Sequence, residues 1–201
     1  MCPGGFIVPS ATSQEEVVVN GMSPSERNSP HANSGIVVEI KPEDLLKYSS
    51  QGELAGLEFQ KEIEREAWIN GGQTQRAPAQ RLADFVSGKY SATLPEVSYF
   101  PGITSSPLHE WLPVSIGSRL REGLRQFGTM MKGFITNEAV ILGVESRTSS
   151  PVRVPRDKET MEHINISGLY PCGEGSGYAG GIVSSAVDGM RAAEAVAAKN
   201  R

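Results

Sequence analysis

The chain has 201 residues, of which 38% are hydrophobic and 21% are charged, and its formal net charge is -4. This length fits one domain, or one domain with an appendage. The sequence contains no basic run and no stretch of 18 apolar residues, so neither a nucleic-acid partner nor a membrane span is expected. Its three histidines are scattered, which argues against a metal site. The two cysteines, Cys2 and Cys172, form no disulfide framework, which favours a cytoplasmic protein.

Short strands are expected in the first forty residues. Phe6–Val8 and Glu16–Val19 are apolar runs of strand length, and Asn20-Gly21 after the second run is a turn signal. A polar loop with two prolines follows at 22–35. Gly35–Ile40, with the sequence GIVVEI, is the clearest strand of this half.

The middle of the chain is predicted to be mainly helical. Pro42 and two acidic residues open a short helix to about Tyr48, because proline and acids suit a first helical turn. A longer amphipathic helix is expected over 53–69, and shorter ones over 78–86 and 113–128.

Strand material returns after these helices. The proline-rich segment 91–108 is expected to be irregular and 131–136 to be a linker, while Ala139–Val144 is a predicted strand. Helices bracketed by strands at both ends indicate the α+β class.

The C-terminal stretch has three successive parts. Leu169–Cys172 is expected to be the end of a buried strand, and a glycine-rich turn follows at Gly173–Gly181. From Gly181 onward the apolar residues recur at helical spacing. A glycine turn that leads into a helix offers free backbone N–H groups to an anion or a polarised carbonyl.

Gly175, Gly177 and Gly180 also spell the dinucleotide fingerprint G-x-G-x-x-G. That fingerprint requires a second strand after the helix and an acidic residue about 20 positions on. The chain ends at Arg201, so no complete βαβ unit is expected here, and the other half of any site must be formed by residues elsewhere.

Three arginines, Arg147, Arg153 and Arg156, follow the last predicted strand among several hydroxyl side chains. Arginine forks with hydroxyl groups suit a phosphate or carboxylate ligand. The alternative is a solvated loop with local ion pairs to Glu145 or Asp157. The pattern leaves both interpretations open.

Several residues in and beside the glycine turn are candidates for binding a ligand. Glu174 can accept hydrogen bonds from ribose or ribityl hydroxyls, or can cap its own turn and face water. Gly180 and Gly181 allow a ring to approach the backbone, or allow the helix to pack on a strand. Tyr178 is expected to be half-buried, and Cys172 to be an inert buried thiol. No nucleophile, base or other catalytic residue can be identified.

These motifs resemble a known family. The segments "ESRTSSPVRVPRD" and "GLYPCGEGSGYAGGIVSSAVDGMRAAE", with "MCPGG" and "NGMSPSERNSPHANSGIVVEI" near the start, are similar to the C-terminal part of bacterial FAD-dependent dehydrogenases, also called NAD(FAD)-utilising dehydrogenases. The resemblance implies a flavoprotein with two dinucleotide-binding domains. It assigns 1–142 to an inserted, substrate-side domain and 143–201 to the last segment of the FAD-binding domain.

The resemblance also implies a cofactor site. The acidic residue Glu174 would lie near the ribityl or diphosphate part of FAD, and the start of the last helix would approach the pyrimidine edge of the flavin ring. The residues implied to bind the cofactor are Gly173, Glu174, Gly175, Gly180, Gly181, Ile182 and Arg147.

Such families begin with a Rossmann strand and a glycine fingerprint, and these 201 residues do not include that part. The expectation is a C-terminal fragment whose partner is the missing N-terminal FAD domain, and which binds FAD weakly or not at all alone. The exposed apolar face of the last helix could instead support a homodimer. The small-molecule substrate is not identified, and a non-catalytic interaction module is the alternative function.

Overall fold

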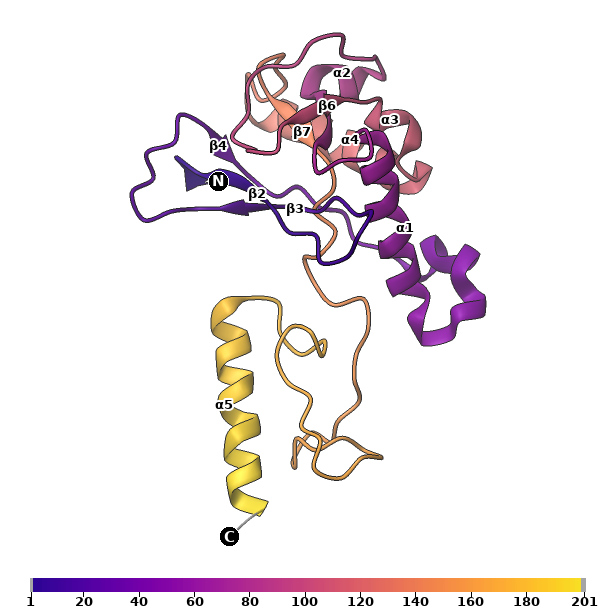
Figure 1. Ribbon diagram of the computed structural model, residues 1–201, viewed down its shortest axis with the longest axis vertical. Helices are drawn as coiled ribbons and strands as arrows, with labels where there is room; N and C mark the ends of the chain where they lie inside the picture. Colours follow the sequence, from indigo (N-terminus) through magenta and orange to yellow (C-terminus); the bar gives the residue numbers. More distant parts are fainter. Residues whose placement is uncertain (1, 200–201) are drawn as a thin grey trace. The chain divides into compact units, whose positions relative to one another are not determined.

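Figure 1 shows the computed structural model, which describes residues 2–199. It is a mixed α+β structure with small sheets, as expected from the sequence. The chain divides into two compact units. The N-terminal unit holds the described residues up to Lys47 and Phe59–Ser146, and the C-terminal unit holds Tyr48–Glu58 and the described residues from Arg147 onward. Within 2–199 no helix is both long and apolar enough to cross a membrane.

A three-stranded sheet forms the centre of the N-terminal unit. Its middle strand β5 (Ala77–Arg81) pairs in parallel with β6 (Ile103–Ser105) and antiparallel with β7 (Val140–Leu142). The first four residues of β5 are buried, and two of them are alanines with no exposed surface. Small side chains on the central strand let neighbouring elements pack closely on it.

Helices cover this sheet. The elements are α1 (Ala55–Asn70), α2 (Leu82–Ser87), α3 (Leu108–Trp111) and α4 (Val114–Met130). Helix α2 contacts both β5 and α4, so the chain turns directly from the central strand into its covering layer. The apolar residues buried at this junction are Ala67, Ala77, Leu82, Phe85, Leu108, Leu112 and Leu124.

Two small antiparallel ladders lie at the start of the chain. Strand β2 (Phe6–Pro9) pairs with β3 (Val19–Met22), and β1 (Cys2–Pro3) pairs with β4 (Ala32–Asn33). The strand predicted at Phe6–Val8 is therefore confirmed. The prediction for Asn20-Gly21 is wrong, because both residues lie within β3 and pair with Val8 and Ile7.

The prediction of one helix over 78–86 is wrong in its first half. Residues up to Arg81 form β5, and only Leu82–Ser87 is helical. Pro78 fits the central strand because its carbonyl accepts a hydrogen bond from the Gly143 N–H at 3.0 Å. Proline has no N–H to donate, so a strand tolerates it where only the carbonyl is needed.

The amphipathic helices were better predicted. Helix α1 matches the expected 53–69, and α4 matches 113–128 but continues past Gly128 to Met130. The short helix predicted from Pro42 is the 3-10 helix η1 (Pro42–Leu54). The strand predicted at Gly35–Ile40 is wrong for the described chain, where this segment belongs to no sheet.

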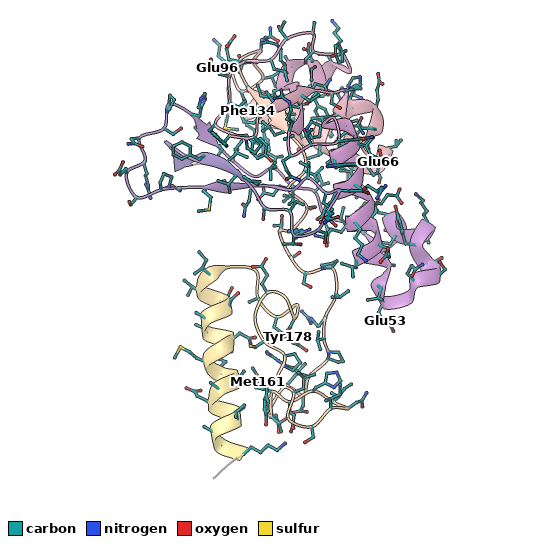
Figure 2. The ribbon with its side chains drawn as sticks, viewed as in Figure 1. Glu53, Glu66, Glu96, Phe134, Met161 and Tyr178 are labelled. Atoms are coloured by element: carbon teal, nitrogen blue, oxygen red, sulfur yellow. The ribbon has the colours of Figure 1, made fainter. Side chains whose placement is uncertain are left out.

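From Arg147 onward, the C-terminal unit consists mainly of loops and one helix, α5 (Ile182–Lys199). The helix expected from Gly181 is thus confirmed. The strand expected at Leu169–Cys172 is not formed. Figure 2 shows Met161 and Tyr178 in the looped chain next to α5, and hydrogen bonds described below tie this loop to the helix.

Candidate functional site

The glycine turn, defined as Gly173–Gly181, is closed by its own backbone. The Tyr178 N–H donates to the Gly173 carbonyl at 3.0 Å, and the Gly177 N–H donates to the Glu174 carbonyl at 2.9 Å. Gly173 and Gly177 have φ values of 73° and 80°, a region that favours glycine. A Cβ atom at Gly177 would lie 2.8 Å from the Val152 carbonyl oxygen, so this glycine is required for close packing.

A buried ion pair attaches the turn to α5. Arg156 donates to both carboxylate oxygens of Asp188, at 2.9 and 2.7 Å, and also to the Pro171 carbonyl at 2.7 Å. Asp188 accepts a further hydrogen bond from the Gly173 N–H at 2.9 Å. The side chains of Arg156 and Asp188 are only 9% and 11% exposed. Loop and helix are therefore joined at the first residue of the turn by charge-assisted hydrogen bonds.

Tyr178 is half-buried, as predicted, and packs on two of the arginines. The guanidinium carbon of Arg156 lies 3.6 Å from the centre of the Tyr178 ring, and that of Arg153 lies 5.0 Å away. The Tyr178 hydroxyl donates to the Val154 carbonyl at 3.0 Å, and Arg153 Nε donates to the Gly177 carbonyl at 3.0 Å. Arg153 and Arg156 therefore support the glycine turn, which uses much of their capacity to bind a phosphate.

The electrostatics of this cluster favour the ionised pair. The hydrogen bond from Arg156 is the largest effect and lowers the pKa of Asp188; burial opposes it, and the hydrogen bond from the Gly173 N–H lowers the pKa further. The hydrogen bond to Asp188 likewise raises the pKa of Arg156. Both groups are thus charged at neutral pH, and the bidentate geometry is kept.

The opposite side of the turn is open. A Cβ atom built at Gly175 or Gly180 would meet no other atom of this chain within 4 Å, and one at Gly181 would only approach the Ser184 hydroxyl at 3.7 Å. No described contact within the chain therefore requires glycine at these positions. They leave the backbone accessible to a group that approaches the start of α5.

The first turn of α5 suits an anion. It contains no acidic residue, and the Ser185 N–H is the donor to the Gly181 carbonyl, at 2.9 Å. The N–H groups before Ser185 have no acceptor in the preceding turn of the helix, as at any helix start, and the helix dipole adds positive potential there. Ile182 and Val183 beside them are 91% and 76% exposed. The helix start thus combines backbone donors with an exposed apolar surface.

The residues predicted to bind a cofactor lie as follows. Glu174 is exposed in the turn, and Ile182 begins α5. Arg147 lies at the start of the C-terminal unit. The turn and helix start bring together Gly173, Glu174, Gly175, Gly180, Gly181 and Ile182. The prediction of a buried thiol at Cys172 is wrong, because Cys172 is exposed and free, and the buried strand to which it was assigned is not formed.

Sequence reasoning missed Asp188. The local ion pairs that it gave as an alternative for the arginines involved the near neighbours Glu145 and Asp157, whereas Arg156 pairs with a residue 32 positions along the chain. The available signal was an acidic residue between apolar neighbours in a helix, which is unusual unless the acid is paired. The buried partner of Arg156 is thus the residue that fixes the site's shape.

The N-terminal unit has a buried polar cluster of its own. Gln80, which is fully buried, lies 2.8 Å from His109 Nδ1 and donates to the Lys89 carbonyl at 2.5 Å. Trp111 Nε1 donates to the Ser106 hydroxyl at 3.0 Å. These side chains satisfy one another, so the cluster stabilises the core. Within the described residues, no group of His, Cys, Asp and Glu could hold a metal ion.

Comparison with known proteins identifies the family. The family described as "FAD-dependent protein, C-terminal domain-like" matches residues 1–148, ending beside Ser146, the last residue of the N-terminal unit. An uncharacterized protein of Clostridium beijerinckii (strain ATCC 51743 / NCIMB 8052) is 42% identical over 201 residues, which cover 99% of this chain and 37% of that protein. The chain thus spans little more than a third of its relative's length. It belongs to the family of FAD-dependent proteins defined by this C-terminal domain.

Proposed function

We propose that the chain is the C-terminal part of an FAD-dependent oxidoreductase of the dehydrogenase type. Residues 1–142 would form the substrate-side domain, and 143–201 would form the closing segment of the FAD-binding domain. The membership of an FAD-dependent family supports the cofactor. The observation that carries the proposal is the start of α5, where backbone donors, open glycines and an acid-free first turn occur together.

The residues at this position fit a flavin. Gly180 and Gly181 have no side chain to obstruct a planar ring, and Ile182 offers an apolar contact at the same place. Glu174, exposed in the preceding turn, would accept hydrogen bonds from sugar or ribityl hydroxyls. Gly173 and Gly175 complete the proposed cradle, and Arg147 would offer a charge to a phosphate.

FAD, when bound, supplies the hydride chemistry. The N–H groups in the first turn of α5 would stabilise negative charge at the cofactor edge that they face, because preorganised dipoles interact strongly with charge. The pair formed by Arg156 and Asp188 would hold those donors in position. Covering Ile182 and Val183 would exclude water, which strengthens the interaction. The substrate would be a small molecule.

The larger part of the polypeptide outside these residues would supply the other half of the site. The apolar side of α5 includes the exposed residues Val183, Val187 and Met190. We propose that the FAD domain covers this side, with a second copy of the chain as the alternative partner. The proposed location is the cytoplasm, because the two cysteines provide no disulfide framework.

The proposal can be tested at Ser184, an exposed residue in the first turn of α5. In the full-length polypeptide, Ser184→Glu places a negative charge at the proposed flavin edge, and Ser184→Gln is the uncharged control of the same size. Added repulsion disfavours the reduced, more negative flavin, so Ser184→Glu should lower the midpoint potential relative to Ser184→Gln. Each 1.4 kcal/mol of repulsion corresponds to about 30 mV for a two-electron couple. Equal potentials would contradict a flavin at this helix.

A further inference from the structure

The segment Gly35–Ile40 has the composition of a strand but the surroundings of a surface loop. Four of its six residues are isoleucine or valine, which favour strands. Ile36, Val37 and Ile40 are nevertheless 40%, 53% and 40% exposed. In a strand, neighbouring side chains point to opposite faces, so as a strand this segment would carry apolar groups on both faces.

The segment nevertheless lies close to other residues of the N-terminal unit at both ends. At Gly35, a Cβ atom would lie only 2.6 Å from a carboxylate oxygen of Glu145, so the backbone passes close to this side chain. At the other end, Arg119 donates to the Glu39 carbonyl at 3.0 Å and to both carboxylate oxygens of Asp44, at 2.7 and 3.0 Å. The exposed run is therefore an anchored part of the N-terminal unit.

An apolar run without polar alternation is typical of a strand that is buried on both faces. Left uncovered, such a run would pair with any exposed strand edge, which soluble proteins avoid. Among residues 2–199, however, no strand pairs with 35–40. A strand that pairs with 35–40 would therefore have to come from residues outside 2–199.

We propose that Gly35–Ile40 is a strand of a sheet completed by strands from the part of the polypeptide outside these 201 residues. In the relative that matches 99% of this chain, residues outside the match make up most of the protein's length. A second copy fits less well, because two-fold pairing of identical segments supplies one neighbouring strand and leaves the other edge open. This inference concerns the segment Gly35–Ile40 of the N-terminal unit and does not depend on a bound flavin.

Cysteine labelling in the full-length polypeptide tests whether the segment is covered. Val37→Cys should react with a maleimide at least about tenfold more slowly than Phe100→Cys, since strand pairing and burial protect a side chain. Phe100 is a matched reference because it lies in the same unit and is 98% exposed. Labelling is located by peptide mass spectrometry, which separates the new thiol from Cys2 and Cys172. Equal rates at the two positions would overturn the proposal.

A second measurement identifies what covers the segment. Backbone amides of 36–40 should exchange slowly with deuterium in the full-length polypeptide, while amides of the polar loop 23–31 exchange fast. A photo-crosslinker at Val37 should link to residues of the same polypeptide outside this chain. Crosslinks formed between isotope-labelled and unlabelled copies would assign the surface to a dimer, and fast exchange at 36–40 would mean that no sheet forms; either result contradicts the proposal. Both readouts apply whether or not flavin is retained, so they fail or succeed separately from the proposed function.

Discussion

At the residue scale, the pair formed by Arg156 and Asp188 determines the geometry of the glycine turn. Asp188 comes from α5, Arg156 comes from the loop, and the carboxylate also binds the Gly173 N–H. Removing one member of a pair that is this well buried leaves the other charge without its partner. The shape of the turn therefore depends on a contact far from the start of α5.

Replacing the carboxylate should loosen the turn. We expect Asp188→Asn to destabilise the C-terminal unit by about 1–3 kcal/mol, since a buried charge loses its partner. Because the folded-state pKa of Asp188 is lowered, the pair stabilises the fold above the unfolded pKa of about 4 and is lost as the pH falls through the folded value. The difference between wild type and variant should thus shrink in acid.

Deuterium exchange at Gly173–Gly177, measured from pH 7 to pH 3, checks this prediction. Glu162→Gln is the control, because Glu162 pairs with Lys199 in the same unit but the lysine side chain is 50% exposed. Exposed pairs contribute less than about 1 kcal/mol. A loss of protection in Asp188→Asn no larger than in Glu162→Gln would show that the buried pair does not hold the turn.

Two glycines of the turn should respond differently to alanine. Gly177→Ala should destabilise the turn, because φ is 80° and the new Cβ would lie 2.8 Å from a carbonyl oxygen. Gly180→Ala should leave stability nearly unchanged, since its Cβ would meet nothing within 4 Å, but should weaken flavin retention by the full-length polypeptide. Thermal unfolding and the ratio of flavin to protein separate the two effects. If Gly180→Ala retained flavin fully, the open side of the turn would not face the cofactor.

At the scale of elements, the sequence predicted the long helices and failed at several strands. Helices α1, α4 and α5 can be recognised in the sequence because apolar residues recur at helical spacing along a single continuous segment. Strand β5 cannot be recognised in this way, since its residues are small and include Pro78. It is a strand because it pairs with β6 and β7, which lie far along the chain. Sequence periodicity carries no information about such partners.

The candidate site was predictable to a similar extent. The glycines and the start of α5 were found because turn and helix signals are local. The role of Asp188 and the exposure of Cys172 could not be predicted, since both follow from how the loop folds back on the helix. For Gly35–Ile40, the apolar pattern points to a strand that the described residues do not complete.

Helix α5 should be sensitive to charge on its apolar side. In the full-length polypeptide, Met190→Lys should destabilise the protein and reduce retained flavin, because a charge would replace an exposed methionine on the face proposed to pack on the FAD domain. Met190→Leu is the control, since it keeps an apolar side chain of similar volume at the same position. Thermal unfolding followed by flavin fluorescence measures both. Equal behaviour of the two variants would mean that this side of α5 faces solvent.

At the scale of the whole molecule, two surfaces are proposed to pack against the rest of the polypeptide. In the N-terminal unit the surface is the anchored segment Gly35–Ile40, and in the C-terminal unit it is the apolar side of α5. A relative that extends well beyond the matched region is consistent with both. We therefore expect the chain to function as part of a larger flavoprotein.

The most direct test is the visible absorption spectrum of the full-length polypeptide, purified without added cofactor. The proposal predicts flavin bands, with FAD identified after the protein is denatured. A control flavoprotein taken through the same purification shows whether bound FAD survives it. If the control keeps its flavin and this protein shows none, the proposal of a flavin-dependent oxidoreductase is contradicted, and a non-catalytic interaction module becomes the better account.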